Sequence, residues 1–241
     1  MQNVRIGNFE FTVSNTAELD KSQLTTLYWN YHPRFRFFKM APLDSKLLDV
    51  GAGSGGLWHW KQWGEPARND IEMYAVDLKK GELFDKYQDY QICNLDKNDL
   101  KYDNNYFDSV LMAHVLEHIQ DENKILAEVE RVLKVDGRLY IEIPSIETLH
   151  YPSKDLFLHK GIDVSTVNFF DDCTHIRTFA LDTLSETLKS HKFKVLESGI
   201  IENKYLESII LSCGIKNSNQ ELSTYGVWLQ LKWAQYIVCK K

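Results

Sequence analysis

The sequence predicts an α/β fold in which a doubly wound, seven-stranded, mostly parallel sheet carries helices on both faces. Two observations lead to this prediction. Near-continuous apolar runs of strand length recur along the chain, and helix-length amphipathic segments separate several of them. Strands that are apolar throughout are typical of parallel strands covered on both faces. At 241 residues, the chain is long enough for one such domain with an appendage.

Seven segments have the composition of strands. In chain order they are 46–50 (KLLDV), 71–77 (IEMYAVD), 90–95 (YQICNL), 107–115 (FDSVLMAHV), 137–144 (GRLYIEIP), 193–201 (FKVLESGII) and 235–241 (QYIVCKK). The segments predicted to be helical are 55–63, 122–134 and 181–192. Residues 205–214 (YLESIILSCG) are compatible with either a helix or a strand.

Two regions depart from this alternation, and we expect them to be additions to a domain formed by residues 45–241. Residues 1–44 are predicted to form an N-terminal helical cap, with a helix over 22–40 that Pro33 bends or splits. The strand-like stretch in this segment is FEFTV. Residues 145–178 are rich in His, Phe and Asp and have no clean period. We therefore expect a lid inserted after the fifth strand.

The composition argues against several classes of function. The net charge is −6 at pH 7, so a basic surface for a nucleic-acid partner is not expected. The four cysteines are scattered, which predicts neither a metal site nor a disulfide framework. The first residues lack an apolar signal core, and no run of about 18 apolar residues occurs. We therefore expect a cytoplasmic protein without a membrane span, whose oligomeric state the sequence does not indicate.

The segment VGAGSGG connects the first predicted sheet strand to a helix. Gly51, Gly53 and Gly56 have the G-x-G-x-x-G spacing of a dinucleotide loop. The first two glycines and Gly55 also have the tighter G-x-G-x-G spacing of a loop that holds a nucleoside without phosphate. Asp77 ends the second strand, where a carboxylate can accept hydrogen bonds from ribose hydroxyls. Both kinds of ligand would use these features.

Asp49, on the strand just before the first glycine, separates the two kinds of ligand. A carboxylate aimed into the loop would repel a pyrophosphate, because like charges in a partly buried site repel more strongly than in water. It would favour a cationic amino group. S-adenosylmethionine carries an α-ammonium and a sulfonium and no phosphate, so this loop favours that cofactor over a nicotinamide dinucleotide.

Three stretches carry a resemblance to a known family: LLDVGAGSG, YFDSVLMAHVLEHI and EVERVLKVDGRLYIEIPS. Together they resemble the class I S-adenosylmethionine-dependent methyltransferases, whose sheet is Rossmann-like. The chain is most similar to the subgroup that methylates small molecules, quinone precursors and sugars. The turn KVDG replaces the Lys-Pro-Gly-Gly usual in this family, which leaves the geometry of that turn open.

The resemblance implies a set of cofactor-binding residues. The residues implied at the methionine end are Asp49, Gly51, Ala52, Gly53, Gly55 and His114. Asp77 would hold the ribose, and Leu78 would pack on the adenine. Two alternatives exist for the contact with the adenine amine: the pair Asn94 and Leu95, or Asp96. Both stay open because the alignment of this segment with the family can slip by two positions.

The expected chemistry is an in-line transfer of a methyl group, which mainly requires alignment of the reactants and exclusion of water. A hydroxyl acceptor must also lose a proton, and a histidine is the natural base. The candidates are His175, His118 and His114. We favour His175, because Asp171 and Asp172 lie close enough in sequence to orient it.

The segment MAHV follows the fourth strand, where methyltransferases that modify adenine or glutamine amino groups carry N-P-P-Y or D-P-P-Y. We therefore expect O-methylation of a small molecule or saccharide, with N- or C-methylation possible. Two other hypotheses compete with this one. The chain could be a cofactor-binding module of the same fold without activity, or, with less support, a nicotinamide-dependent oxidoreductase.

Overall fold

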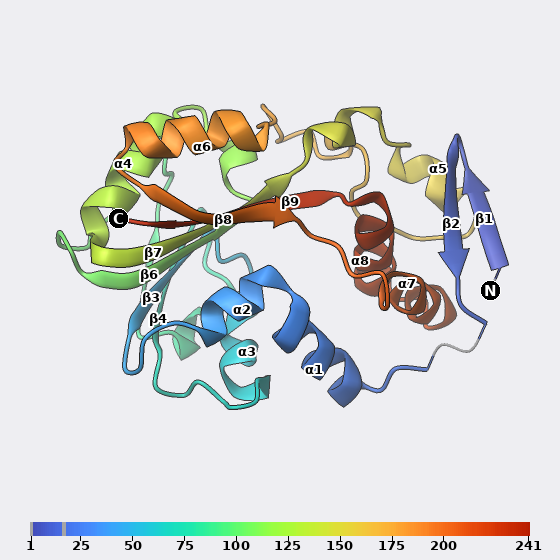
Figure 1. Cartoon of the computed structure of the whole chain (residues 1–241), viewed down its shortest axis with the longest axis horizontal. Coiled ribbons are helices and arrows are strands. Elements are labelled where there is room, and N and C mark those ends of the chain that lie inside the picture. Colours follow the sequence, from blue (N-terminus) through green and yellow to red (C-terminus); the bar gives the residue numbers. More distant parts are fainter. Residues whose placement is uncertain (1, 16–17) are drawn as a thin grey trace. The chain divides into compact units, whose positions relative to one another are not determined.

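The computed structural model describes residues 2–15 and 18–241 (Figure 1). The chain divides into two compact units, which we describe separately. The sheet unit comprises Thr25–Ile143, Phe179–Gly199 and Tyr236–Lys241. The hairpin unit comprises Met1–Leu24, Pro144–Thr178 and Ile200–Gln235.

A seven-stranded sheet forms the centre of the sheet unit, and the predicted α/β fold is confirmed among the described residues. Its strands are β3 (Lys46–Val50), β4 (Glu72–Asp77), β5 (Asp89–Ile92), β6 (Phe107–Ala113), β7 (Leu133–Pro144), β8 (Lys194–Ile200) and β9 (Ala234–Lys240). They lie in the order β5-β4-β3-β6-β7-β9-β8. The first five strands in this order pair in parallel. β9 runs antiparallel to β7, because Lys241 bonds to Gly137 at one end and Trp233 to Ser145 at the other.

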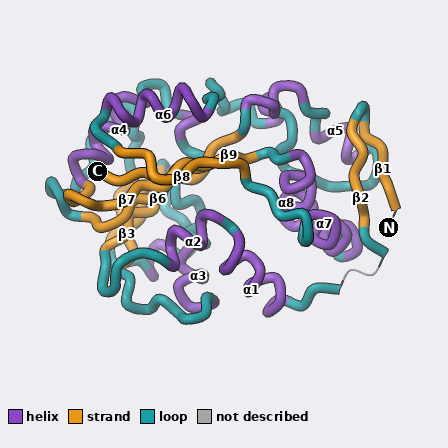
Figure 2. The backbone as a smooth tube through the Cα atoms, viewed as in Figure 1, coloured by secondary structure: helices purple, strands orange, loops and turns teal. Residues whose placement is uncertain are grey.

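Helices cover both faces of this sheet, as Figure 2 shows. On one face lie α4 (Glu122–Val132) and α6 (Leu181–Ser190), whose buried leucines and isoleucine join the strands in one apolar core. Asp121 caps α4 by accepting a hydrogen bond from the backbone of Lys124 at 3.1 Å. On the other face lie α2 (Pro33–Lys39) and α3 (Leu57–Trp63).

The predicted helix over 22–40 is split, as expected, by Pro33. The first part, α1, spans Lys21–Tyr31, and α2 begins at the proline itself. Proline has no N–H to donate, so the first position of a helix suits it. The adjoining His32 caps α2 by accepting from the backbone N–H of Arg34. The break therefore sets the start of α2, which packs Phe37 against Tyr140 of β7 with ring centroids 5.5 Å apart.

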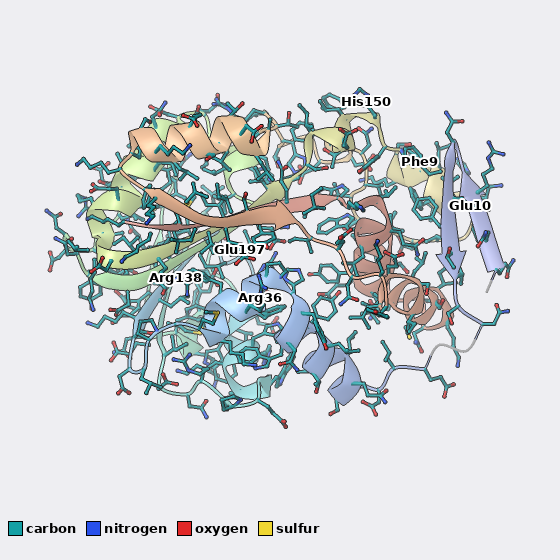
Figure 3. All side chains as sticks on the ribbon, viewed as in Figure 1. Phe9, Glu10, Arg36, Arg138, His150 and Glu197 are labelled. Atoms are coloured by element: carbon teal, nitrogen blue, oxygen red, sulfur yellow. The ribbon has the colours of Figure 1, made fainter. Side chains whose placement is uncertain are left out.

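Two arginines on α2 reach carboxylates of the sheet. Arg34 forms an ion pair with Glu142 on β7, and the side chain of Glu142 is only 3% exposed. Arg36 pairs with Glu197 on β8, where both side chains are half-exposed, and Figure 3 labels this second pair. The hydroxyl of Tyr236 on β9 also donates to Glu197. These contacts hold α2 against three neighbouring strands.

The hairpin unit has its own core. It contains the antiparallel hairpin of β1 (Gln2–Ile6) and β2 (Phe9–Val13) and the helices α5 (Lys154–Leu158), α7 (Glu207–Lys216) and α8 (Gln220–Leu231). Its buried apolar residues include Phe11, Phe157, Leu211 and Val227. The strand signal at 9–13 is confirmed, and the segment 205–214, left open by the sequence, contributes to a helix.

The sequence did not reveal α8. Its buried face mixes large apolar residues with small or polar ones, so the stripe of large apolar residues is interrupted. The small or polar buried residues are Ser223, Thr224 and Gly226. The reason is close packing against α7. A Cβ on Gly226 would lie 2.4 Å from the backbone nitrogen of Leu211.

The residues predicted as a lid, 145–178, belong to the hairpin unit and contain short helical turns. Trp228 and Trp233 stack with ring centroids 3.9 Å apart, and their indole N–H groups donate to the carbonyls of Thr166 and Val167 at 2.6 Å each. The roles of this segment as a lid and of residues 1–44 as a cap stay predictions. No helix among the described residues combines the length and the apolar composition needed to cross a membrane.

We expect Gly226→Ala to destabilise the protein by about 2 kcal/mol, because the added methyl group must push α7 and α8 apart. Urea unfolding measures this change. Gly56→Ala is the matched control, since its added Cβ would lie 3.7 Å from the nearest atom and make an ordinary contact. Equal stabilities of the two variants would contradict the close packing of these helices.

Candidate cofactor-binding and active site

The glycine-rich turn follows β3, which lies between β4 and β6 in the sheet unit. Gly51, Gly53 and Gly55 all have left-handed backbone conformations, with φ of 70°, 57° and 85°. Such φ angles cost little only for glycine. A Cβ on Gly51 would also overlap Val115, at 2.3 Å, whereas a Cβ on Gly53 would meet nothing within 4 Å. The turn therefore presents open space above its backbone at Gly53.

Asp77 lies beside this turn, as the sequence predicts. Its Oδ2 accepts a hydrogen bond from the backbone N–H of Gly53 at 2.8 Å. The next residue, Leu78, is 64% exposed. The carboxylate of Asp77 and the exposed apolar side chain of Leu78 thus follow each other at the end of β4. This arrangement fits a ribose and an adenine ring, and both roles stay predictions.

Asp49 is buried beneath the turn, with 4% of its surface exposed. The hydroxyl of Tyr87 donates to its Oδ2 at 2.9 Å, while Oδ1 accepts no hydrogen bond from the described residues. Burial raises the pKa of Asp49 to about 6, although Tyr87 and Arg34 act to lower it. At pH 7 and above this residue is therefore mainly an anion. A buried anion with an available oxygen fits a cationic ligand group and opposes a phosphate.

The two predicted alternatives for the adenine contact both lie after β5. Oδ1 of Asn94 accepts from the backbone N–H of Asp96 at 2.9 Å. The carboxylate of Asp96 in turn accepts from the backbone N–H of Gln120 at 2.8 Å. Leu95, between them, is 8% exposed. Asn94 thus shapes its own loop, whereas Asp96 links that loop to the connection before α4. Both alternatives stay predictions.

His114 follows β6 in a left-handed conformation, with φ of 57°. This conformation is uncommon for residues other than glycine and is typical of constrained functional sites. Glu142 on the neighbouring strand holds it twice: the carbonyl of Glu142 accepts from the His114 backbone N–H at 2.8 Å, and Oε1 lies 3.0 Å from Nε2. On the other side of the ring, Nδ1 lies 3.3 Å from Oε1 of Glu117.

These contacts decide the charge of His114. Burial alone would lower its pKa, but the contacts with Glu117 and Glu142 raise the pKa of His114 to about 9. Glu142 is in turn paired through both oxygens with Arg34, at 3.0 and 2.5 Å, and accepts from the hydroxyl of Tyr140 at 2.7 Å. Although burial opposes it, Arg34 and His114 hold the pKa of Glu142 well below its usual range. His114 is therefore a cation at neutral pH.

Glu142, Tyr140 and Tyr87 are not among the site residues predicted from the sequence. The signal for Glu142 was present, because it is an acid inside the otherwise apolar segment LYIEIP. A buried acid in such a strand needs partners, which makes it a candidate for a polar network. Tyr87 had no comparable signal, since a tyrosine in a loop is common and its contact with Asp49 spans 38 residues.

The other two candidate histidines lie in different units. His118 ends a short 3-10 helix in the sheet unit, and its backbone N–H donates to Val115. His175 lies in the hairpin unit, where its Nδ1 donates to the carbonyl of Phe169 at 2.7 Å. This bond fixes the tautomer in which the lone pair is on Nε2. Nε2 lies 3.9 Å from Oδ2 of Asp172.

Asp171, which we expected to help orient His175, is used elsewhere. Its Oδ2 accepts hydrogen bonds from the backbone N–H groups of Lys154, Val167 and Asn168. These bonds stabilise the turn that carries Phe169. Of the two aspartates, Asp172 is therefore the one that contacts His175.

Comparison with known proteins identifies the fold and the family of the chain. A family model described as a methyltransferase domain matches residues 48–141. The ubiquinone/menaquinone biosynthesis C-methyltransferase UbiE of Burkholderia vietnamiensis is 32% identical over 172 residues, which cover 68% of this chain and 68% of that protein. UbiE of Desulfotalea psychrophila is 27% identical over 139 residues, which cover 54% of this chain and 56% of that protein.

A solved structure of a SAM-dependent methyltransferase from Archaeoglobus fulgidus matches with a TM-score of 0.57 and 18% identity, over 92% of this chain and 95% of that one. At this identity the likeness shows the shared fold. The chain spans about half the length of several of the curated relatives that it matches, including 50% of UbiE from Laribacter hongkongensis.

We expect the imidazole of His114 to titrate near pH 9, where its two carboxylate neighbours place its pKa. Histidine side-chain NMR measures this value directly. His32 serves as an internal comparison, because burial lowers its pKa to about 4. Glu142→Gln removes one negative neighbour and should lower the pKa of His114 by about one unit or more. A His114 that titrates near 6.5 in the unchanged protein would contradict this network.

Proposed function

The chain belongs to the class I S-adenosylmethionine-dependent methyltransferases, and we propose that it transfers the methyl group of this cofactor to a hydroxyl-bearing small molecule. The observation that carries the proposal is the buried carboxylate of Asp49 beneath a glycine turn that Asp77 flanks. These two carboxylates accept hydrogen bonds, and they match a ligand that donates from an ammonium group and from ribose hydroxyls. When bound, the cofactor supplies an electrophilic methyl group.

The residues of the sheet unit fit this cofactor. Asp49 and the backbone of Gly51, Ala52, Gly53 and Gly55 would hold its methionine end, Asp77 the ribose and Leu78 the adenine. The second carboxylate oxygen of Asp49 is available for the ammonium group. The contribution of these residues is to bind and orient, because an in-line transfer needs alignment more than acid or base groups.

A hydroxyl acceptor also needs a base, and we propose His175 for this role. Its support is the tautomer that the Phe169 carbonyl fixes, which leaves Nε2 as the proton acceptor. His118 is the second candidate. His114 is unsuited to take up a proton at neutral pH, because Glu117 and Glu142 already hold it protonated. We propose that His114 instead fixes the wall of the site at the end of β6.

Two kinds of acceptor atom, oxygen and carbon, are candidates for methylation. O-methylation of a small molecule or saccharide is the proposal that the sequence supports. The curated relatives favour a second candidate, since their printed activity is C-methylation in quinone biosynthesis. Both reactions can begin with loss of a proton from a hydroxyl group, which makes oxygen, or a ring carbon next to it, more nucleophilic. The proposed roles of the site residues are therefore the same for both.

Labelled S-adenosylmethionine with a cell extract tests the activity and identifies the product. Transfer of label to a small molecule supports an enzyme, and NMR then distinguishes a methyl group on oxygen from one on carbon. Cofactor binding without transfer to any fraction would instead support the inactive module. Binding of a nicotinamide dinucleotide without binding of S-adenosylhomocysteine would support the oxidoreductase.

We expect Asp77→Asn to weaken the binding of S-adenosylhomocysteine by about 100-fold, because bonds from ribose hydroxyls to a carboxylate are worth more than bonds to an amide. Calorimetry measures the affinity. Asp85→Asn is the matched control on the same connection, where Asp85 makes an ion pair with Lys80. Comparable affinities of the Asp77 variant and the unchanged protein would remove Asp77 from the cofactor site.

We expect His175→Asn to lower kcat by about 100-fold or more, since general-base catalysis typically contributes at least this factor. Cofactor affinity should stay within about twofold. Asparagine can preserve the bond to the Phe169 carbonyl, so the turn should keep its shape. His159→Asn, at an exposed position of the hairpin unit, is the control. Unchanged turnover in the His175 variant, measured with the acceptor identified in the extract, would exclude His175 as the base.

A further inference from the structure

The side chain of Tyr87 contacts both Asp49, on the strand before the glycine turn, and Gly55 in the turn itself. Tyr87 follows a 3-10 helix, Phe84–Lys86, in the connection between β4 and β5, and it is 7% exposed. Its hydroxyl lies 2.9 Å from Oδ2 of Asp49 and 3.2 Å from the carbonyl oxygen of Gly55. One buried oxygen therefore contacts both the carboxylate beneath the turn and the backbone of the turn itself.

The hydroxyl of Tyr87 is a donor in these contacts. Burial and the negative charge of Asp49 raise the pKa of Tyr87, so that the phenol keeps its proton. Both neighbouring oxygens, the carboxylate and the carbonyl, can only accept when Asp49 is ionised. The ring also packs closely against the turn, because a Cβ built on Gly55 would lie only 3.2 Å from its Cε2.

Two other charged groups act on Asp49. Arg34 of α2 favours its ionised form, and Asp77 at the end of β4 disfavours it. The guanidinium of Arg34 makes its two short bonds to Glu142 rather than to Asp49. Tyr87 is therefore the residue, among those described, that donates a hydrogen bond to the Asp49 carboxylate.

We propose that Tyr87 is a positioning residue for the cofactor: its hydroxyl holds Oδ2 of Asp49, fixes the orientation of the carboxylate and leaves Oδ1 for the α-ammonium group. This inference rests on the proposed function of the same site. Tyr87 acts through Asp49 and need not touch the cofactor itself.

The proposal has a consequence for the pH dependence of binding. Burial raises the pKa of Asp49 to about 6, and the bond from Tyr87 opposes this rise. Only the ionised carboxylate attracts an ammonium group, so affinity should fall as the pH drops through about 6. Removal of the hydroxyl favours the protonated form. The loss of affinity should then begin at a higher pH.

The experiment is calorimetric titration with S-adenosylhomocysteine between pH 5 and 8, for the unchanged protein and Tyr87→Phe. A hydrogen bond to a charged group shifts a pKa by about one unit. We expect the midpoint of the acidic fall to move from about 6 to about 7, with affinities at pH 8 within about threefold. Tyr90→Phe is the control, because Tyr90 lies on the adjoining β5 and contacts Phe84 and Lys80.

A double-mutant cycle separates positioning from support of the fold. In an Asp49→Asn background the acidic fall should disappear, and adding Tyr87→Phe should change the affinity by less than about twofold. An equal loss at every pH, with the same loss in the Asp49→Asn background, would overturn the proposal. Circular dichroism verifies that the variants fold, and carbon NMR of the Asp49 carboxyl without ligand gives its pKa independently of binding.

The cycle also distinguishes this inference from the proposed function. If the unchanged protein binds S-adenosylhomocysteine but the Tyr87 variant keeps the midpoint near 6, the inference fails and the proposed function stands. If the unchanged protein does not bind S-adenosylhomocysteine at any pH, both fail.

Discussion

The interaction on which the site depends is the burial of a negative charge under the glycine turn. Asp49 occupies a strand whose neighbours Leu48 and Val50 point into the apolar core, and the alternation of strand side chains sends its carboxylate to the opposite face. An anion there is costly unless it has partners. Tyr87 provides one hydrogen bond, and a cationic ligand group would complete the site. The negative charge of Asp49 therefore favours an ammonium group over a pyrophosphate, although the glycine spacing suits either ligand.

A second buried acid organises the neighbouring strand ends. Glu142 binds Arg34, Tyr140 and His114, so charges of alternating sign run from α2 across β7 to the end of β6. Replacing Glu142 would remove the carboxylate that Arg34 and His114 share, and such networks are sensitive to mutation. The network also sets the charge of His114, which it keeps cationic. The proposal for His175 rests on a separate contact, its bond to the Phe169 carbonyl.

Much of the sheet unit could be predicted because its signals are local. Apolar runs marked the seven strands, Pro33 marked the break between two helices, and the glycines with Asp49 and Asp77 marked the loop. The missed features depend on contacts between distant residues. α8 buries small and polar residues among its apolar ones, and β1 buries little beyond Ile6. The bonds of Tyr87 to Asp49 and of Arg34 to Glu142 join segments 38 and 108 residues apart. No spacing rule connects such positions.

The most direct test of the account is a crystal structure of the protein with S-adenosylhomocysteine. We expect electron density for this ligand over Gly51 to Gly55, with its amino group within hydrogen-bonding distance of Asp49 and its ribose hydroxyls on Asp77. Density in which the amino group contacts neither Asp49 nor the backbone of the turn, or a ligand phosphate that lies directly above Asp49, would contradict it.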